Sequence, residues 1–250
     1  MERWIGKIAI VTGASSGIGE AISKAFASAG CHVIGLARRD DRLSKLTNEL
    51  SSVKGSFDGV KCDIRNEQDI INAFKFAENK YGCVDVLINN SGICENKFLS
   101  DSTTEDIRSV VDVNLIGAAL CTREAVKVMR KYGSEGHIIN INSVLGLNAN
   151  LANAPTGMYA ASKFGLRAMS QNWRKEFTQK KDKIRITEIY PGLVKTEIVN
   201  SYDPTGKMYD VLPHLKAKDI SDCVIFALSA PSHVQVEEIT VAPLHASLQK

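Results

Sequence analysis

Residues 8–19 read Ile8-Ala9-Ile10-Val11-Thr12-Gly13-Ala14-Ser15-Ser16-Gly17-Ile18-Gly19, a short apolar run that leads into a glycine-rich turn. The apolar run is typical of a strand that is covered on both faces. The three glycines let the backbone turn tightly and approach a ligand, and the residues after them have helical periodicity. A strand, a glycine-rich turn and a helix in this order predict a βαβ unit whose helix N-terminus can bind an anion.

The rest of the chain repeats this alternation of short apolar runs and longer amphipathic stretches. Further strands are expected at His32–Leu36, Val60–Cys62, Val84–Ile88, His137–Ile141, Ile184–Ile189 and Glu238–Val241. Helices are expected near 17–29, 40–52, 67–81, 104–131, 157–180 and 218–229. Parallel neighbours need long crossovers, so this alternation predicts an α/β fold, a single-domain Rossmann-type doubly wound parallel sheet with helices on both faces.

Composition excludes several classes of protein. The 250 residues are 44% hydrophobic and 24% charged, as in an ordinary globular domain. A net charge of +3 is too small for a dedicated nucleic-acid or membrane-surface binder. Six scattered cysteines and five histidines show no metal-ligand spacing, so we expect no metal and a cytoplasmic, reducing location.

The glycine-rich turn has the spacing GxxxGxG. In a doubly wound sheet such a turn carries the pyrophosphate of a dinucleotide on the helix N-terminus, although the pattern alone also fits a plain tight turn. The βαβ context favours dinucleotide binding. The expected contacts from this segment are Gly13, Ser15, Ser16, Gly17, Ile18 and Gly19.

The end of the second expected strand indicates which dinucleotide is bound. An acid at this point would hold a ribose 2′-hydroxyl, as in NAD-binding sheets, but the chain has Ala37 there, followed by Arg38 and Arg39. Guanidinium groups bind phosphate in a bidentate manner, so the sequence favours NADP(H) over NAD(H). The alternative is a solvated basic turn neutralised by Asp40 and Asp41.

Four polar residues form the candidate catalytic group. Tyr159 and Lys163 are four residues apart and lie on one helical face. Ser143 ends the preceding strand at the carboxyl edge of the sheet, and Asn114 interrupts an apolar run. Each also has a plain structural interpretation, as a packed aromatic, a turn residue or an asparagine that satisfies backbone groups.

Together these motifs resemble the short-chain dehydrogenase/reductase family of the 250-residue type. The resemblance covers essentially the full length, and its motifs occur in family order: TGxxxGxG, Asp63, Asn89-Asn90-Ser91-Gly92, Asn114, Ser143, Tyr159, Lys163 and Pro191-Gly192. Met1–Trp4, Cys121–Ala125 and His137–Ser143 are most similar to the insect farnesol (antennal) dehydrogenase-like branch. The resemblance implies one domain over residues 1–250, with a cofactor half at about 1–142 and a catalytic and substrate-loop half at about 143–250.

The resemblance also implies a role for each site residue. Tyr159 is the general acid–base, Ser143 binds the substrate oxygen together with Tyr159, and Asn114 orients a water that passes protons towards Lys163. Lys163 favours the phenolate of Tyr159 and, with Tyr159, contacts the cofactor. The remaining cofactor contacts are Asp63, Ile64, Asn90, Ser91, Gly92, Pro191, Gly192, Val194 and Thr196.

The substrate side is less specific. Residues 197–214 mix apolar and turn residues, including Tyr202, and fit either a mobile lid or a packed surface helix and loop. Leu145, Leu147 and Met158 add apolar surface. We expect a hydrophobic alcohol such as an isoprenoid, interconverted with its carbonyl compound. A hydroxysteroid dehydrogenase and a catalytically idle NADP(H)-binding regulator stay open as alternatives.

Family members usually associate through two long central helices, here 104–131 and 157–180. The resemblance therefore implies at least a homodimer. The C-terminal segment Gln235–Pro243 lacks the VDGG-like ending common in the family, so a tetramer is less certain than a dimer.

Overall fold

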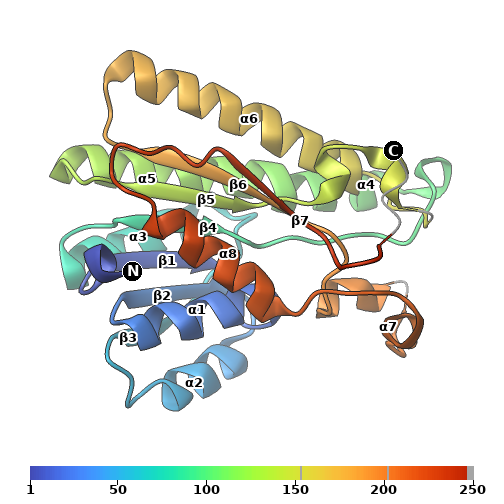
Figure 1. Cartoon of the computed structure of the whole chain (residues 1–250), viewed down its shortest axis with the longest axis horizontal. Helices are drawn as coiled ribbons and strands as arrows, with labels where there is room; N and C mark the ends of the chain where they lie inside the picture. The colour runs from blue at the N-terminus through green and yellow to red at the C-terminus, as the bar shows by residue number, and fades with distance from the viewer. Residues whose placement is uncertain (153, 202, 247–250) are drawn as a thin grey trace.

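The computed structural model describes residues 1–152, 154–201 and 203–246, and these form a seven-stranded parallel sheet between two layers of helices (Figure 1). The strand order is β3-β2-β1-β4-β5-β6-β7. The strands are β1 (Ile8–Thr12), β2 (His32–Ala37), β3 (Ser56–Lys61), β4 (Val86–Asn89), β5 (His137–Ile141), β6 (Arg185–Pro191) and β7 (Glu238–Val241). The doubly wound fold predicted from the sequence is confirmed.

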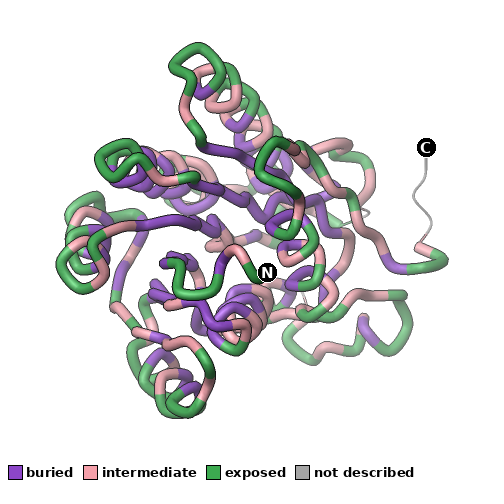
Figure 2. Tube along the Cα trace, turned by 60° about the vertical axis from the view of Figure 1, so that its left-hand side comes forward, coloured by how far each residue is buried: buried purple, intermediate pink, exposed green. Residues whose placement is uncertain are grey.

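Helices cover both faces of this sheet. They are α1 (Gly17–Ala29), α2 (Asp40–Glu49), α3 (Glu67–Tyr81), α4 (Thr104–Val111), α5 (Ala118–Tyr132), α6 (Tyr159–Lys180), α7 (Met208–Val211) and α8 (Ala217–Ser229). Helices α1, α2 and α8 share one apolar core with the sheet, and α3, α5 and α6 share the other. Figure 2 shows the buried strands between these layers, with the exposed sides of the helices facing outward.

The largest differences from the expected elements are at the third strand and at the helix over 104–131. The third strand begins at Ser56 rather than Val60, because β3 is an edge strand whose polar and glycine residues partly face solvent. The expected helix over 104–131 is interrupted by a π-helical segment, η3 (Asp112–Gly117), between α4 and α5. Such a segment inserts one residue into the hydrogen-bond ladder without changing the apolar pattern enough to be visible in the sequence.

The position of β1 defines where a ligand can bind. Strand β1 pairs with β2 on one side and with β4 on the other. The chain therefore extends the sheet in one direction from β1 to β3 and in the opposite direction from β4 to β7. Open α/β sheets bind ligands beyond the carboxyl ends of the strands at such a switch point. Across the described ranges, no helix combines the length and the apolar character needed to cross a bilayer.

Candidate active site

The glycine-rich turn lies at this switch point, between β1 and α1. Gly13 and Gly17 have φ angles of +67° and +58°, which side chains other than glycine rarely adopt. A Cβ at Gly19 would lie 2.4 Å from the carbonyl oxygen of Gly13, so only glycine fits there. Ser16 precedes α1 without capping it through its side chain. The amide groups of the first helical turn therefore remain as donors for a phosphate.

The segment after β4 holds this turn in place. The side-chain amide of Asn90 donates to the carbonyl oxygens of Thr12 (2.9 Å) and Gly13 (3.3 Å). The hydroxyl of Thr12 accepts from the backbone N–H groups of Asn90 and Ser91. Asn90 thus shapes the turn through its side chain, and its direct contact with a cofactor stays a prediction.

Of the two arginines after β2, Arg39 lies over the glycine-rich turn. Its guanidinium donates to the hydroxyls of Ser15 (3.0 Å) and Ser16 (2.7 Å) and pairs with the carboxylate of Glu197 at 2.7 Å. Arg38 is exposed beside it, and Ala37 ends the strand. The donor set around the turn therefore combines cationic, hydroxyl and backbone N–H groups, which fits a dinucleotide with an additional phosphate.

Asp63 and Ile64 follow β3 at the carboxyl edge of the sheet. The carboxylate of Asp63 accepts three side-chain hydrogen bonds from Arg65, at 3.0, 3.1 and 2.6 Å, and these lower its pKa. Ile64 is buried, and a Cβ at Gly117 would lie 2.8 Å from its Cδ1. Asp63 therefore stays ionised, while Ile64 supplies an apolar wall.

The segment after β6 closes the other side of the turn. A Cβ at Gly17 would lie 3.1 Å from the Cγ2 of Thr196, so this residue packs against the turn. The hydroxyl of Tyr209 in α7 contacts the backbone of Thr196 and Val194 at 3.2–3.3 Å. Pro191 ends β6, and the N–H of Gly192 donates to Val241. Segments 191–196 and 13–19 thus face one another.

Tyr159 and Lys163 lie one turn apart at the start of α6. Both are buried, and the Nζ of Lys163 is 5.6 Å from the ring centre of Tyr159 and donates to the carbonyl oxygen of Ile141 at 2.8 Å. Burial lowers the pKa of Lys163 to about 8, and burial also raises the pKa of Tyr159. Burial dominates the pKa of the phenol, and the effect of Lys163 on its acidity stays a prediction.

Ser143 follows β5 and lies beside Tyr159. Its side chain interacts with the phenol and partly opposes the rise in the pKa of that group. Its hydroxyl oxygen accepts from the N–H of Leu145 at 3.1 Å, and its own N–H donates to the Oδ1 of Asn142 at 2.9 Å. The serine is therefore held from both sides and is buried next to the phenol.

Asn114 lies within the π-helical segment η3. Its side chain donates to the carbonyl oxygen of Ile93 (2.9 Å) and to the hydroxyl of Ser162 (3.1 Å), and it accepts from the N–H of Ile93. A Cβ at Gly92 would lie 3.6 Å from its Oδ1 and 3.9 Å from the Nζ of Lys163. The asparagine is thus near the lysine, but its side chain satisfies backbone groups, as its plain structural interpretation anticipated.

The substrate side combines packed and exposed apolar groups. Between Ser143 and Tyr159, Leu145, Leu147 and Met158 are half-buried. In the segment 197–214, Val199 and Tyr209 are buried, whereas Val211 is exposed. Tyr202 lies outside the described residues. The segment is therefore anchored at two points, and whether it moves stays a prediction.

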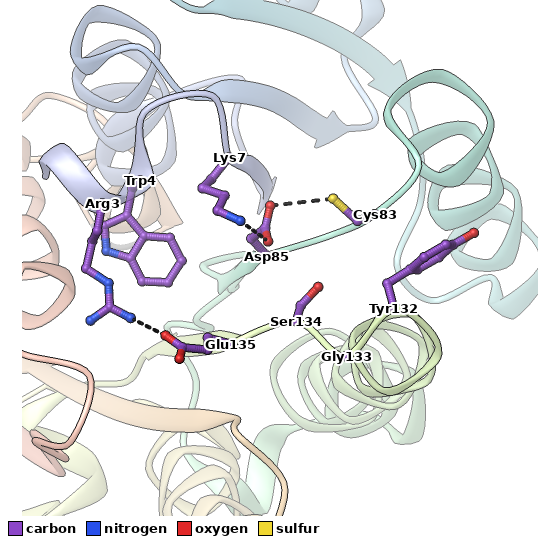
Figure 3. Close-up of a pocket in the computed structure, with 9 residues that line it drawn as sticks. All are labelled: Arg3, Trp4, Lys7, Cys83, Asp85, Tyr132, Gly133, Ser134 and Glu135. Carbon is purple, nitrogen blue, oxygen red and sulfur yellow. Dashed lines mark hydrogen bonds and ion pairs between the residues drawn. The ribbon is translucent and has the colours of Figure 1, made fainter.

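The amino edge of the sheet carries a hollow, drawn in Figure 3. It is lined by residues that precede strands or follow α5: Arg3, Trp4, Lys7, Cys83, Asp85, Tyr132, Gly133, Ser134 and Glu135. Its charged groups neutralise one another, with Lys7 paired to Asp85 at 3.3 Å and Arg3 paired to Glu135 at 3.1 Å. The phosphate-binding donors and the acid–base pair lie instead at the carboxyl edge of the sheet.

Sequence reasoning gave no role to three residues that border the carboxyl-edge site. Asn142 contacts Ser143, Glu188 lies buried behind it, and Glu197 pairs with Arg39. A signal existed for two of them, because Asn142 and Glu188 are polar residues in or next to central strands that are covered on both faces.

A sequence profile described as short chain dehydrogenase matches residues 7–206, which is most of the chain. The chain belongs to this family. The farnesol dehydrogenase of Aedes aegypti is 41% identical over 247 residues, covering 98% of both chains. Dehydrogenase/reductase SDR family member 11 of Gallus gallus is 38% identical over 251 residues, covering 97% of this chain and 98% of the relative.

A solved family structure agrees with this assignment. The alcohol dehydrogenase from the archaeon Thermococcus sibiricus, complexed with 5-hydroxy-NADP, superposes with a TM-score of 0.82 and is 28% identical. The match covers 94% of this chain and 95% of that protein. The resemblance stated from the sequence motifs is confirmed, and the chain is a short-chain oxidoreductase with a site for a nicotinamide cofactor.

Proposed function

We propose that the protein is an NADP(H)-dependent oxidoreductase that interconverts a hydrophobic alcohol, such as the isoprenoid farnesol, with its carbonyl compound. The observation that carries this proposal is the burial of Ser143, Tyr159 and Lys163 together at the carboxyl edge, next to the glycine-rich turn. The similarity to a farnesol dehydrogenase and the half-buried leucines beside Ser143 support a hydrophobic substrate.

In the proposed reaction Tyr159 exchanges a proton with the substrate oxygen. The phenol is protonated near neutral pH and can therefore donate a proton in carbonyl reduction. Ser143 donates a hydrogen bond to the same oxygen as negative charge develops there. When bound, the nicotinamide supplies or accepts the hydride. In alcohol oxidation the phenol has to lose its proton, and the nearby ammonium of Lys163 stabilises the phenolate.

The cofactor is held by this chain's residues on three sides. The glycine-rich turn and Ser15 and Ser16 bind the pyrophosphate, and Arg38 and Arg39 bind the 2′-phosphate. Asp63, Ile64 and the segment 90–92 border the adenosine half, and the segment 191–196 with Lys163 borders the nicotinamide half. We assign to Asn114 the role of orienting a water between Lys163 and solvent.

Cofactor preference is tested by replacing the positions that decide it. The double variant Ala37→Asp/Arg38→Gln removes a guanidinium and adds a carboxylate for a ribose hydroxyl. We expect the NADP-to-NAD ratio of kcat/KM to fall by about 10–100-fold, the equivalent of losing hydrogen bonds between charged groups. Arg108→Gln, on the exposed surface of α4, is the matched control and should leave the ratio unchanged. Equal use of both cofactors by the wild type would contradict the NADP assignment.

The reaction itself is tested by a turnover screen. Farnesol and related isoprenoid alcohols, hydroxysteroids and their carbonyl counterparts are each offered with NADP(H) and NAD(H), and the reduced-nicotinamide absorbance is followed. We expect the highest kcat/KM with an isoprenoid alcohol and NADP⁺. A higher kcat/KM on hydroxysteroids would favour the hydroxysteroid dehydrogenase alternative. Cofactor binding without turnover of any substrate would favour the idle regulator.

We further propose that the protein is at least a homodimer and acts in the cytoplasm. Ile116 in η3 and Phe164 in α6 are 47% and 41% exposed, which leaves apolar surface on the helices that the family uses for association. Light scattering at micromolar concentration should give at least twice the 27.3 kDa chain mass. A monomer would contradict the proposed assembly. Cell fractionation tests the location.

A further inference from the structure

A row of buried polar side chains crosses the middle of the sheet. Asn89 in β4 is the register partner of Asn140 in β5, and Asn140 is the register partner of Glu188 in β6. The Nδ2 of Asn89 donates to the Oδ1 of Asn140 at 2.8 Å. The row ends at Glu188, whose carboxyl group is fully buried.

The carboxyl group of Glu188 is surrounded by donors. Its Oε1 accepts from the Nδ2 of Asn140 at 3.0 Å and contacts the hydroxyl of Ser170 on α6. Its Oε2 accepts from the Nδ2 of Asn142 at 2.5 Å. A buried carboxyl group is costly unless it is paired and hydrogen-bonded, and these three donors, two from amide groups, favour its ionised form. The proposed catalytic steps do not use this residue.

Asn142 connects Glu188 to both catalytic segments. Its Oδ1 accepts from the N–H of Ser143 at 2.9 Å, and its Nδ2 donates to the carbonyl oxygen of Lys163 at 3.1 Å as well as to Glu188. If the amide were rotated by half a turn, its NH₂ group would face the N–H of Ser143. Its oxygen would then face the carbonyl oxygen of Lys163 and the carboxylate of Glu188. The amide of Asn142 therefore has a single orientation, in which it joins Glu188 to the N–H of Ser143 and the carbonyl group of Lys163.

The carboxylate of Glu188 also acts electrostatically on the buried ammonium of Lys163. The titratable groups that act on this ammonium come from three elements: Glu188 from β6, Cys94 from the segment after β4, and Tyr159 from α6. Burial lowers the pKa of Lys163, and the carboxylate of Glu188 opposes that shift. The reciprocal effect is present, because Lys163 opposes the rise in the pKa of Glu188 that burial causes.

We propose that Glu188 is a positioning residue for the reaction: through Asn142 it fixes Ser143 and the backbone of Lys163, and its charge balances the buried ammonium. Only the predicted effect of Glu188 on turnover rests on the proposed function. The effect on the charge of Lys163 is a property of the protein alone.

The charge effect is measured by ¹³C NMR of lysine Cε signals during a pH titration of the protein without nucleotide or substrate. The Lys163 signal is identified by its loss in Lys163→Met. In the wild type it should titrate near pH 8. In Glu188→Gln the midpoint should move down by about 1–3 pH units, the size of shift that a nearby opposite charge produces.

Glu238→Gln is the matched control for this titration. Glu238 is the register partner of Glu188 one strand further along, and it pairs with Arg167 instead of joining the row. This variant should leave the Lys163 midpoint unchanged. A folded Glu188→Gln with the wild-type midpoint would overturn the charge-balancing part of the proposal.

Steady-state kinetics test the positioning of Ser143. Glu188→Gln should lower kcat by up to about 100-fold, with little change in the KM of the alcohol, because misplacing a catalytic group acts mainly on the transition state. Glu188→Asp, which keeps the charge, should recover part of the loss.

Asn142→Ala keeps Glu188 but removes the side chain that connects it to Ser143. This variant tests the positioning role if Glu188→Gln does not fold. It should lower kcat without the large fall in the Lys163 midpoint. An unchanged kcat in a folded Asn142→Ala would overturn the positioning role. If no substrate of the screen is turned over, the proposed function fails, while the titration still decides whether Glu188 and Lys163 are coupled.

Discussion

Each edge of the sheet carries a lysine, but the two lysines differ in burial and in the group that they contact. At the amino edge, Lys7 and Asp85 pair with each other within a hollow that is open to solvent (Figure 3), and the lysine side chain is 49% exposed. At the carboxyl edge, Lys163 is buried and donates to a backbone carbonyl, and its pKa is lowered to about 8. The Lys7–Asp85 pair has an exposed ammonium and contributes little beyond local stability, whereas a buried ammonium beside a phenol has a changed proton affinity that chemistry can use.

Backbone direction explains part of this difference. In a parallel sheet all strands end at the same edge, so the segments after β4, β5 and β6 and the N-terminus of α1 converge there. The amino edge receives the C-terminal ends of helices and the starts of strands. Comparing variants at the two edges therefore tests whether burial at the carboxyl edge, rather than residue type, decides function.

The largest expected effect follows from removing the buried ammonium. Lys163→Ala should lower kcat/KM by roughly 10³–10⁶-fold, because it removes support for the acid–base group and hydrogen bonds to the cofactor. The separate loss of cofactor binding is measured by fluorescence titration with NADPH. Lys180→Ala, near the exposed end of the same helix, is the control. Equal kcat/KM values in Lys163→Ala and Lys180→Ala would contradict the proposed role of the buried lysine.

A smaller effect is expected from the serine at the carboxyl edge. Ser143→Ala should lower kcat by about 10²–10³-fold, as when one donor to a developing oxyanion is removed, and should leave NADPH affinity unchanged. Ser134→Ala at the amino-edge hollow is the matched control and should retain wild-type kcat. A kcat of Ser143→Ala equal to that of the control would argue against a bond from this hydroxyl to the substrate oxygen.

The smallest effect on turnover is expected at the amino edge. The carboxylate of Asp85 is buried and accepts from the N–H of Ile8 at 2.9 Å, so Asp85→Ala leaves a buried donor without a partner. The free energy of unfolding should fall by roughly 1–3 kcal/mol, measured by urea denaturation, while kcat stays near the wild-type value. A large loss of kcat in the folded variant would show that the two edges are coupled.

Much of the fold could be predicted because its signals are local. The boundaries of α1, α3, β5 and β7 agree with the expected ranges, and Gly30 and Gly82 mark the ends of the two helices. The start of β3 was misplaced, because Ser56 and Asp58 belong to an edge strand that lacks a continuous apolar run. The π-helical segment at Asn114 leaves the apolar pattern almost unchanged, so only the structure reveals it.

The site was predictable as a set of residues but not as a network. The motifs named Ser143, Tyr159 and Lys163, and the structure brings these three together. Glu188 stands in phase with Ile184 and Ile186, so the sequence marks it as a polar residue on a buried face. Its partners Asn140 and Asn142 depend on strand order, which periodicity does not contain.

The most direct test compares one tyrosine from each edge. The rate constant of nicotinamide reduction is measured by stopped-flow absorbance with saturating NADP⁺ and alcohol, for the wild type, Tyr159→Phe and Tyr132→Phe. Each variant removes one hydroxyl and keeps the ring, and Tyr132 lines the amino-edge hollow. The account predicts a fall of about 10²–10⁴-fold for Tyr159→Phe with unchanged NADPH affinity, and the wild-type rate for Tyr132→Phe. A wild-type rate in Tyr159→Phe would contradict the assignment of chemistry to the carboxyl edge.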